Sequence, residues 1–216
     1  MSEKLGPIHY QMYEKIKFQD DISKFLMDDN TSEIDKDLEP VSRKDLAEII
    51  DQDNVHGYLA SKIDVVENRL AKAIKLSSDP KKKMYELGVS KAEDFSSYQD
   101  LFNKLNSYLL DGMPCDNALS AGIDPEGNLL LITNDNLHSK YQKAYVNPDD
   151  SLNASCGGGD HDHHHSFDLK ELDGENLKEE NSTYHDYRYE FIKGFLSKSS
   201  YGVDLVNGIN YKIYQK

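Results

Sequence analysis

The chain has 216 residues, and its 39 Asp and Glu against 25 Lys and Arg give a formal net charge of -14 at pH 7. An acidic surface repels nucleic acid and anionic membranes, so we expect neither as a partner. No apolar run approaches the ~20 residues of a membrane span, and two cysteines do not make a disulfide framework, so a reducing cytoplasm is the simplest setting.

The first half of the chain has the apolar spacing and the capping residues of helices. Three long helices are predicted, over residues 7 to about 27, 55 to about 77, and 90 to 112. Residues 28–40 are acidic and indicate a solvated connector. A short apolar stripe follows in residues 42–52, just before the second long helix.

The second half is patterned differently. Residues 129–133 are a short strand candidate, and residues 184–198 predict a last helix. Residues 147–182 are polar, glycine-rich and acidic, and we expect mostly loop there. Alternating apolar residues on both sides of Asn207-Gly208 predict a β-hairpin over 201–214, because this dipeptide favours a type I′ turn.

These elements predict one domain over residues 1–216 of the α+β class, mainly α. Its helical, bundle-like part spans 1–122. Its mixed α/β part spans 123–216, contains the His-rich loop near 147–182, and ends in a small antiparallel sheet.

Two of the predicted helices begin alike. Ile8-His9 precedes Met12, Lys15, Ile16 and Asp20, while Val55-His56 precedes Leu59, Lys62, Ile63 and Glu67 at the same spacing. Each His lies on the apolar face, and each acid lies on nearly the same face about 16 Å further along the axis. A return helix in 42–52 would make the long helices parallel, so that His9 meets His56. A loop there allows antiparallel helices, with each His facing the other helix's acid. Coincidence between two amphipathic helices is the alternative.

A run of glycine, acid and histidine is the most visible candidate for metal chemistry. Its candidate ligands are Cys156, His161, His163 and His165. Thiolate and imidazole bind Zn²⁺ and related divalent transition metals. Catalytic metals need ligands held by rigid elements, so we interpret the run as a loading, storage or sensing segment. An ordered site and an incidental polar loop are the alternatives.

A second candidate site lies in the predicted core. If Pro114 begins a helix, Cys115 lies in its first turn, where the helix dipole favours a thiolate. A small buried side chain is the alternative for this cysteine. His138 follows the strand candidate. We predict a metal site made of His9, His56, Cys115 and His138, a mixed set that suits zinc.

The leading prediction is therefore a protein that binds a divalent transition metal, with zinc as the first choice. If water takes the fourth position, the site activates it for hydrolysis, with Asp20 or Glu67 as the base. One alternative is a non-enzymatic interaction protein, whose acidic surface binds a basic protein and whose histidines are structural. A further alternative is a thiol enzyme that uses Cys115.

Overall fold

The structure is a computed structural model, which describes residues 5–51, 53–144, 169–172, 174 and 177–216. Its helices are α1 (Pro7–Leu26), α2 (Ser32–Asp35), α3 (Leu46–Ile49), α4 (Val55–Leu76), α5 (Pro80–Ser90), α6 (Tyr98–Asn106), α7 (Ser139–Ala144) and α8 (Thr183–Phe195), with a 3₁₀ turn η1 (Pro114–Asp116). Its strands are β1 (Leu119–Ile123), β2 (Leu129–Thr133), β3 (Lys170–Glu171), β4 (Tyr201–Val206) and β5 (Asn210–Gln215). The predicted α+β class, mainly α, is confirmed.

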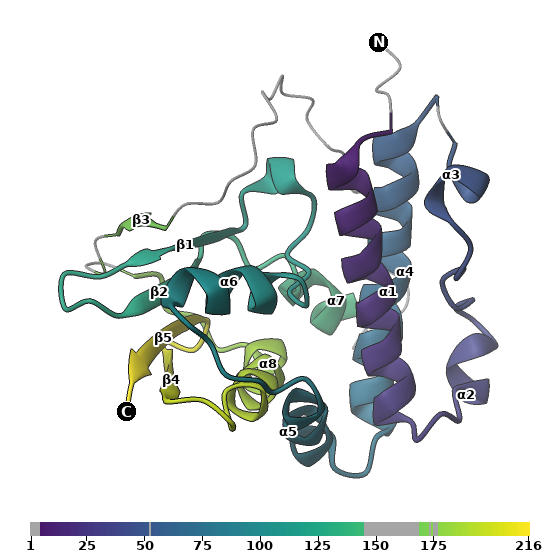
Figure 1. Cartoon of the computed structure of the whole chain (residues 1–216). Helices are drawn as coiled ribbons and strands as arrows, with labels where there is room; N and C mark the ends of the chain where they lie inside the picture. Colours follow the sequence, from purple (N-terminus) through teal and green to yellow (C-terminus); the bar gives the residue numbers. More distant parts are fainter. Residues whose placement is uncertain (1–4, 52, 145–168, 173, 175–176) are drawn as a thin grey trace.

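The two long helices α1 and α4 lie side by side and run parallel (Figure 1). Near their starts, the ring centroids of His9 and His56 are 5.9 Å apart. Just past the middle of the two helices, Arg69 Nε donates to Asp20 Oδ1 at 2.6 Å. Of the two arrangements that the sequence left open, the structure has the parallel one, in which His9 meets His56. The stretch between α1 and α4, which we call the return segment, holds only the single-turn helices α2 and α3.

The acidic connector after α1 is less solvated than its composition predicts. Ile34 in α2 is fully buried, and Val41 is buried further along the same segment. Asp45 caps α3: its carboxylate accepts a hydrogen bond from Ala47 N. The segment therefore packs its few apolar residues against α1 and α4 and, apart from the half-buried Asp35, leaves its acids exposed.

Where the sequence predicts one helix over 90–112, α5 ends at Ser90 and α6 begins only at Tyr98. Asp79 caps α5 by accepting from Lys82 N, and Pro80 occupies the first turn. Ser90 is the last residue of α5, and Ser97 caps α6. The prediction of a start at Ser90 was wrong, although the Asp-Pro pair is itself a helix-start signal.

Two glycines let α5 approach α8 at backbone distance. A Cβ on Gly88 would lie 2.1 Å from Phe191 O, and a Cβ on Gly194 would lie 2.1 Å from Tyr85 O. No larger residue fits at either position without a shift of one helix. This crossing fixes α8, which carries the polar side chains described below.

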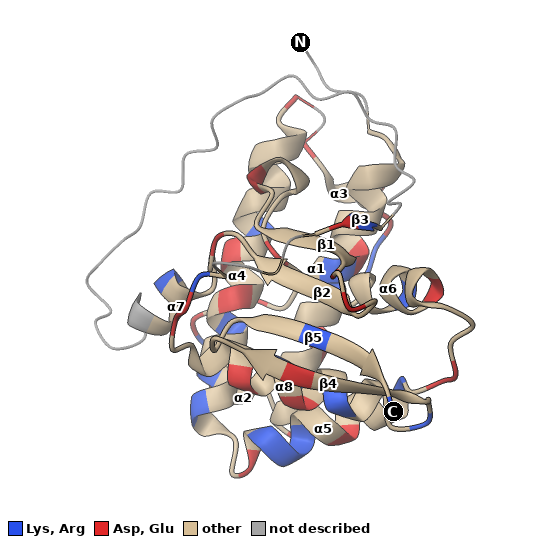
Figure 2. Cartoon of the chain, turned by 90° about the vertical axis from the view of Figure 1, so that its left-hand side faces the viewer, with Lys and Arg blue, Asp and Glu red and all other residues tan. Residues whose placement is uncertain are grey.

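The five strands form one sheet in the order β3-β1-β2-β5-β4, antiparallel except for the β1–β3 pair. Asn207 and Gly208 have φ of 50° and 77°, so the predicted hairpin turn is confirmed. The strand predicted over 129–133 is confirmed as β2, while β1 lies partly in the region predicted as helical. Figure 2 shows the strands in front of α1, α5 and α8, so helices cover one face of the sheet. Within the described ranges, no helix combines the length and the apolar character that crossing a bilayer requires.

Candidate functional site

The structure brings only two of the four predicted core ligands together. His9 and His56 lie together at the start of the long helices. His138 instead contacts Glu67, which follows His56 by eleven residues on α4, a rise of about 16 Å. Cys115 is half-buried in η1. In the described part of the chain, no group of three or more His, Cys, Asp or Glu side chains is arranged to hold a metal. The other predicted ligands, Cys156, His161, His163 and His165, lie outside the described residues.

His9 has a structural use that competes with metal binding. It is the third residue of α1, and its Nδ1 accepts a hydrogen bond from Gly6 N at 2.9 Å. A neutral imidazole that accepts at Nδ1 carries its proton on Nε2. A metal at Nδ1 would break the helix cap, and a metal at Nε2 would have to displace that proton.

The helix expected to begin at Pro114 is only the three-residue turn η1. Such a turn lacks the aligned peptides that give a helix its dipole, so the argument for a stabilised thiolate at Cys115 was wrong. The neighbouring Asp116 accepts from Met113 N at 2.7 Å. Its negative charge also disfavours a thiolate at the adjacent residue.

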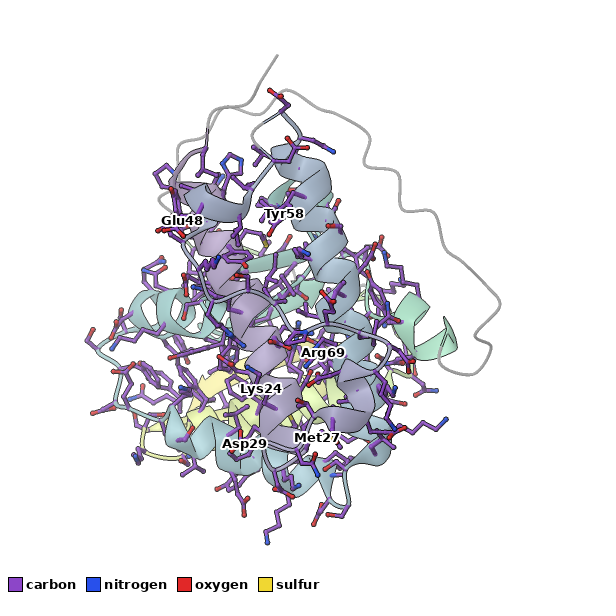
Figure 3. The ribbon with its side chains drawn as sticks, turned by 90° about the vertical axis from the view of Figure 1, so that its right-hand side faces the viewer. Lys24, Met27, Asp29, Glu48, Tyr58 and Arg69 are labelled. Carbon is purple, nitrogen blue, oxygen red and sulfur yellow. The ribbon has the colours of Figure 1, made fainter. Side chains whose placement is uncertain are left out.

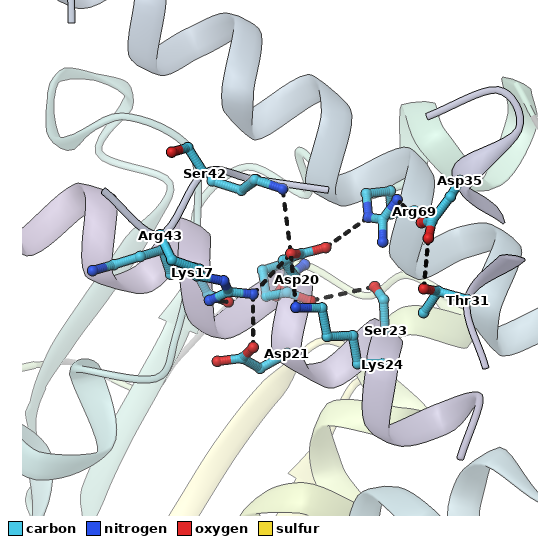
Figure 4. Close-up of polar contacts among 12 residues, drawn as sticks. Lys17, Asp20, Asp21, Ser23, Lys24, Thr31, Asp35, Ser42, Arg43 and Arg69 are labelled. Carbon is cyan, nitrogen blue, oxygen red and sulfur yellow. Dashed lines mark hydrogen bonds and ion pairs between the residues drawn. The ribbon is translucent and has the colours of Figure 1, made fainter. Parts of the chain in front are cut away.

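Asp20, one of the two predicted bases, is fully buried and surrounded by donors (Figure 4). Arg69 Nε donates to its Oδ1 at 2.6 Å, and Arg43 Nη2 donates to its Oδ2 at 2.8 Å. Arg69 also reaches Asp35 on the return segment at 2.7 Å. We call Asp20, Asp35, Arg43 and Arg69 the Asp20 cluster. Figure 3, which views this side of the molecule, shows Arg69 on α4 beside Lys24 on α1. The cluster ties the return segment to both helices and leaves Asp20 no role as a base.

Glu67, the second predicted base, faces a titratable partner. Its Oε1 accepts from Gln19 Nε2 at 3.0 Å, and its Oε2 lies 3.0 Å from His138 Nδ1. Glu67 and His138 are each 3% exposed. The His138 ring stacks on Tyr184 of α8, with centroids 3.6 Å apart and an interplanar angle of 14°. The carboxylate and the stacked ring therefore hold His138 in one orientation.

The second nitrogen of His138 faces a buried ion pair. Its Nε2 lies 3.1 Å from Arg188 Nη2 and 3.4 Å from Asp111 Oδ1. Arg188 Nη1 donates to the same Asp111 oxygen at 2.7 Å, and Arg188 Nη2 donates to Tyr184 Oη at 2.7 Å. We call Glu67, Asp111, His138, Tyr184 and Arg188 the His138 cluster. It joins α4, the 107–113 connection, the start of α7, and α8.

Both protonation states of His138 have partners in this cluster. Burial opposes a charged ring, but Glu67 and Asp111 outweigh burial and raise the pKa of His138 above its ordinary value. Arg188 can only donate, so Nε2 accepts from it when the ring is neutral, and Nε2–H turns to Asp111 when the ring is charged. Burial likewise opposes the Asp111 charge, yet Arg188 and His138 hold the pKa of Asp111 far below its usual range.

The surroundings of the cluster also have shifted pKa values. Burial and the Arg188 charge lower the pKa of His185 to about 2, so this ring is neutral at pH 7. Burial lowers the pKa of Lys15 to about 8, although Asp111 acts in the opposite direction. Asp111 Oδ2, Arg188 Nε and His185 Nε2 are buried and have no hydrogen-bond partner within the described residues. An unsatisfied buried polar group lowers the free energy of unfolding by about 1–3 kcal/mol. Stability alone therefore does not explain these groups.

A cavity of about 170 Å³ opens beside the cluster, between α4, α7 and the connection through η1. Its apolar walls include Ala60, Ile63, Met113 and Leu137. Its polar lining residues are Asp64, Glu67, Asp116, His138, Lys140 and Tyr141. The Tyr141 hydroxyl donates to Asp64 Oδ1, and Lys140 Nζ lies 3.6 Å from the same oxygen. The buried Glu67–His138 pair thus forms part of a cavity wall.

Sequence reasoning selected Glu67 and His138 but did not pair them, and it missed Asp111, Tyr184 and Arg188. The scarcity of arginine was the available signal. Arg43 and Arg69 belong to the Asp20 cluster, and Arg188, the third arginine of the chain, belongs to the His138 cluster. Since Arg cannot lose its proton in a protein, a rare Arg among apolar residues indicates a buried acidic partner.

Comparison with models of protein families, with curated proteins and with solved structures gives no match. The function is therefore argued from the geometry of the two clusters and the cavity.

Proposed function

We propose that this protein binds a small organic molecule in the cavity between α4 and α7, in contact with the Glu67–His138 pair. The observation that carries the proposal is a buried titratable pair in the wall of a cavity. Perturbed pKa values in a cleft are a physical signature of functional sites.

The size and the lining of the cavity support a ligand of about one ring. A dry engineered cavity of about 150 Å³ accommodates benzene, and this cavity measures about 170 Å³. Ligand sites are mostly apolar, with a few polar groups that fix orientation. The apolar walls and the polar groups on α4 and α7 match that description.

The energetics of the His138 cluster also favour a functional role. Buried ion pairs seldom stabilise a fold more than apolar residues of the same volume. The cluster nevertheless places Glu67, Asp111, His138 and Arg188 in the interior. A ring that can hold or release a proton at this position can adjust its hydrogen bonds when a ligand enters the adjacent cavity.

The test is a titration with benzyl alcohol, a neutral ring with one hydroxyl, followed by NMR. We expect saturable shifts of the His138 and Tyr141 ring signals. Ala60→Leu, which fills the cavity from α4, should abolish the shifts. Ala71→Leu is the matched control, because Ala71 is also half-buried on α4 but does not line the cavity. Absence of saturable binding, or binding that survives Ala60→Leu, would overturn the proposal.

Zinc or another divalent transition metal is a second candidate ligand. The observation that favours it is the approach of His9 to His56 within 5.9 Å, close to the start of α1. The test is metal content by mass spectrometry of tag-free protein, of a variant lacking residues 157–165, and of His56→Ala. Metal lost only without 157–165 would assign binding to the His-rich run, and metal lost only in His56→Ala would assign it to the helix pair. Metal in none of them would reject this candidate.

A further inference from the structure

We infer that the cavity selects small organic cations over neutral and anionic molecules of the same shape. This inference deepens the proposed function and rests on it. It is carried by the charges that line the cavity together with its apolar walls, and not by the carboxylates alone.

Carboxylates outnumber cations around the cavity. Asp64, Glu67 and Asp116 line it, whereas Lys140 is the one ammonium group among the described residues that line it. When His138 is protonated, it neutralises Glu67 at 3.0 Å. The two carboxylates of Asp64 and Asp116 and the ammonium of Lys140 then still leave a net charge of one negative unit around the cavity.

The other nearby cations are engaged elsewhere. Arg188 binds Asp111 at 2.7 Å behind the His138 ring and does not line the cavity. Lys15 Nζ donates to Asn106 Oδ1 at 2.9 Å, also outside the lining. The excess charge is therefore left to solvent or to a ligand. The net charge of -14 gives the whole molecule a field of the same sign.

The apolar walls favour an organic cation over a bare metal ion. Ala60, Ile63, Met113 and Leu137 offer no ligand atoms beyond one thioether, and a hydrated ion gains nothing from them. A ring or a short alkyl group fills that side, while an attached ammonium reaches Asp64 or Asp116. The ligand class that fits is a primary or secondary amine of about one ring.

The experiment compares three probes of one shape at constant ionic strength: benzylammonium, benzyl alcohol and benzoate. We expect benzylammonium to bind roughly two- to fivefold more tightly than benzyl alcohol, the range typical of one partly exposed ion pair. Benzoate should bind more weakly than both. Asp64→Asn keeps an acceptor for Tyr141 and removes one charge, so it should lower the ratio of the benzylammonium affinity to the benzyl alcohol affinity. Glu48→Gln, at an exposed site on α3, is the matched control and should change nothing.

Failure of the inference and failure of the proposed function give different results. If none of the three probes binds, the cavity is not a ligand site and both are overturned. If benzyl alcohol binds and benzylammonium binds no better, the charge selectivity is wrong and the proposed function stands. If benzylammonium still binds to Ala60→Leu with unchanged affinity, it binds the acidic surface, and the inference is overturned.

Discussion

Asp20 and Glu67 occupy the same place in two similar helices and have different surroundings. Each follows a histidine by eleven residues, and each is buried on a helix of the parallel pair. Asp20 faces the return segment and two arginines. Glu67 faces a histidine and a cavity. Equal positions in a sequence pattern therefore do not imply equal roles.

The partner decides what each acid can do. Arg69 keeps its charge at any pH that a protein tolerates, so Asp20 is held as a fixed ion pair. A histidine, unlike an arginine, can lose its proton within the pH range that a protein tolerates, so Glu67 belongs to a pair that can respond to its environment. The Asp20–Arg69 pair holds the return segment against the two long helices, whereas the Glu67–His138 pair suits a binding site.

The largest expected effect is the loss of stability in Asp20→Asn. This change leaves the Arg69 guanidinium, which is fully buried, without its nearest counter-ion. Breaking a buried pair from one side costs about 3–5 kcal/mol, so urea unfolding should report a loss of that size. A loss below about 1 kcal/mol, the range of exposed pairs, would show that Asp20 does not fasten the return segment.

Glu67→Gln should cost less, about 1–3 kcal/mol, because His138 can shed its charge and Gln19 is neutral. The cost should also depend on pH. The pKa of His138 is raised in the folded state, so the stability from this pair is complete below the unfolded value of 6.5. It is lost as pH rises through the folded value. The measurement is the free energy of unfolding of the parent protein and of Glu67→Gln, from below pH 6.5 upward, together with an NMR titration of His138. It checks the size of the stability difference and the direction in which that difference changes with pH. A pH-independent difference would contradict the assigned pair.

The fold was largely predictable because local patterns determine most of it. The Pro7 start, the Asn207-Gly208 turn and the apolar stripe from Val55 act within a few residues of themselves, and each prediction is confirmed. α5 was missed because the residues around Asp79-Pro80 were treated only as the end of the preceding helix, and the next helix was begun at Ser90.

The site was less predictable because its residues meet through tertiary packing. His138 lies far in sequence from Glu67 and from Arg188, and no spacing rule connects them. His138 was grouped with His9 and His56 in the sequence analysis because all three side chains are possible ligands of one metal ion. The structure separates them, because one end of the helix pair is occupied by a cap and the middle by the His138 cluster.

After Glu67→Gln, the next largest expected effect is a loss of folding stability at low pH caused by His185, which lies next to the His138 cluster. His185 accepts or donates at Nδ1 with the Tyr211 hydroxyl at 2.7 Å, and burial lowers its pKa to about 2. The unfolded chain binds a proton there near pH 6.5 and the folded chain does not, so stability falls as pH drops below 6.5. The slope approaches about 1.4 kcal/mol per pH unit for one group. His185→Gln should flatten the stability curve between about pH 6.5 and pH 5, above the usual pKa values of carboxyl groups. An unchanged slope would contradict a neutral, buried His185.

The smallest expected effect tests whether burial, and not the mere presence of an ion pair, distinguishes Asp20. Asp21 binds the same Arg43 nitrogen at 2.7 Å, but its side chain is 53% exposed, whereas that of Asp20 is 0% exposed. Exposed pairs contribute about 0–1 kcal/mol and are screened by salt. Asp21→Asn should therefore change the free energy of unfolding by less than about 1 kcal/mol, and added salt should shrink even that difference. The substitution removes the same charge one residue away, so it is the matched control for Asp20→Asn. If the two variants were equally destabilised, net charge on α1 would explain both results, and the contrast between a fastening acid and a site acid would fail.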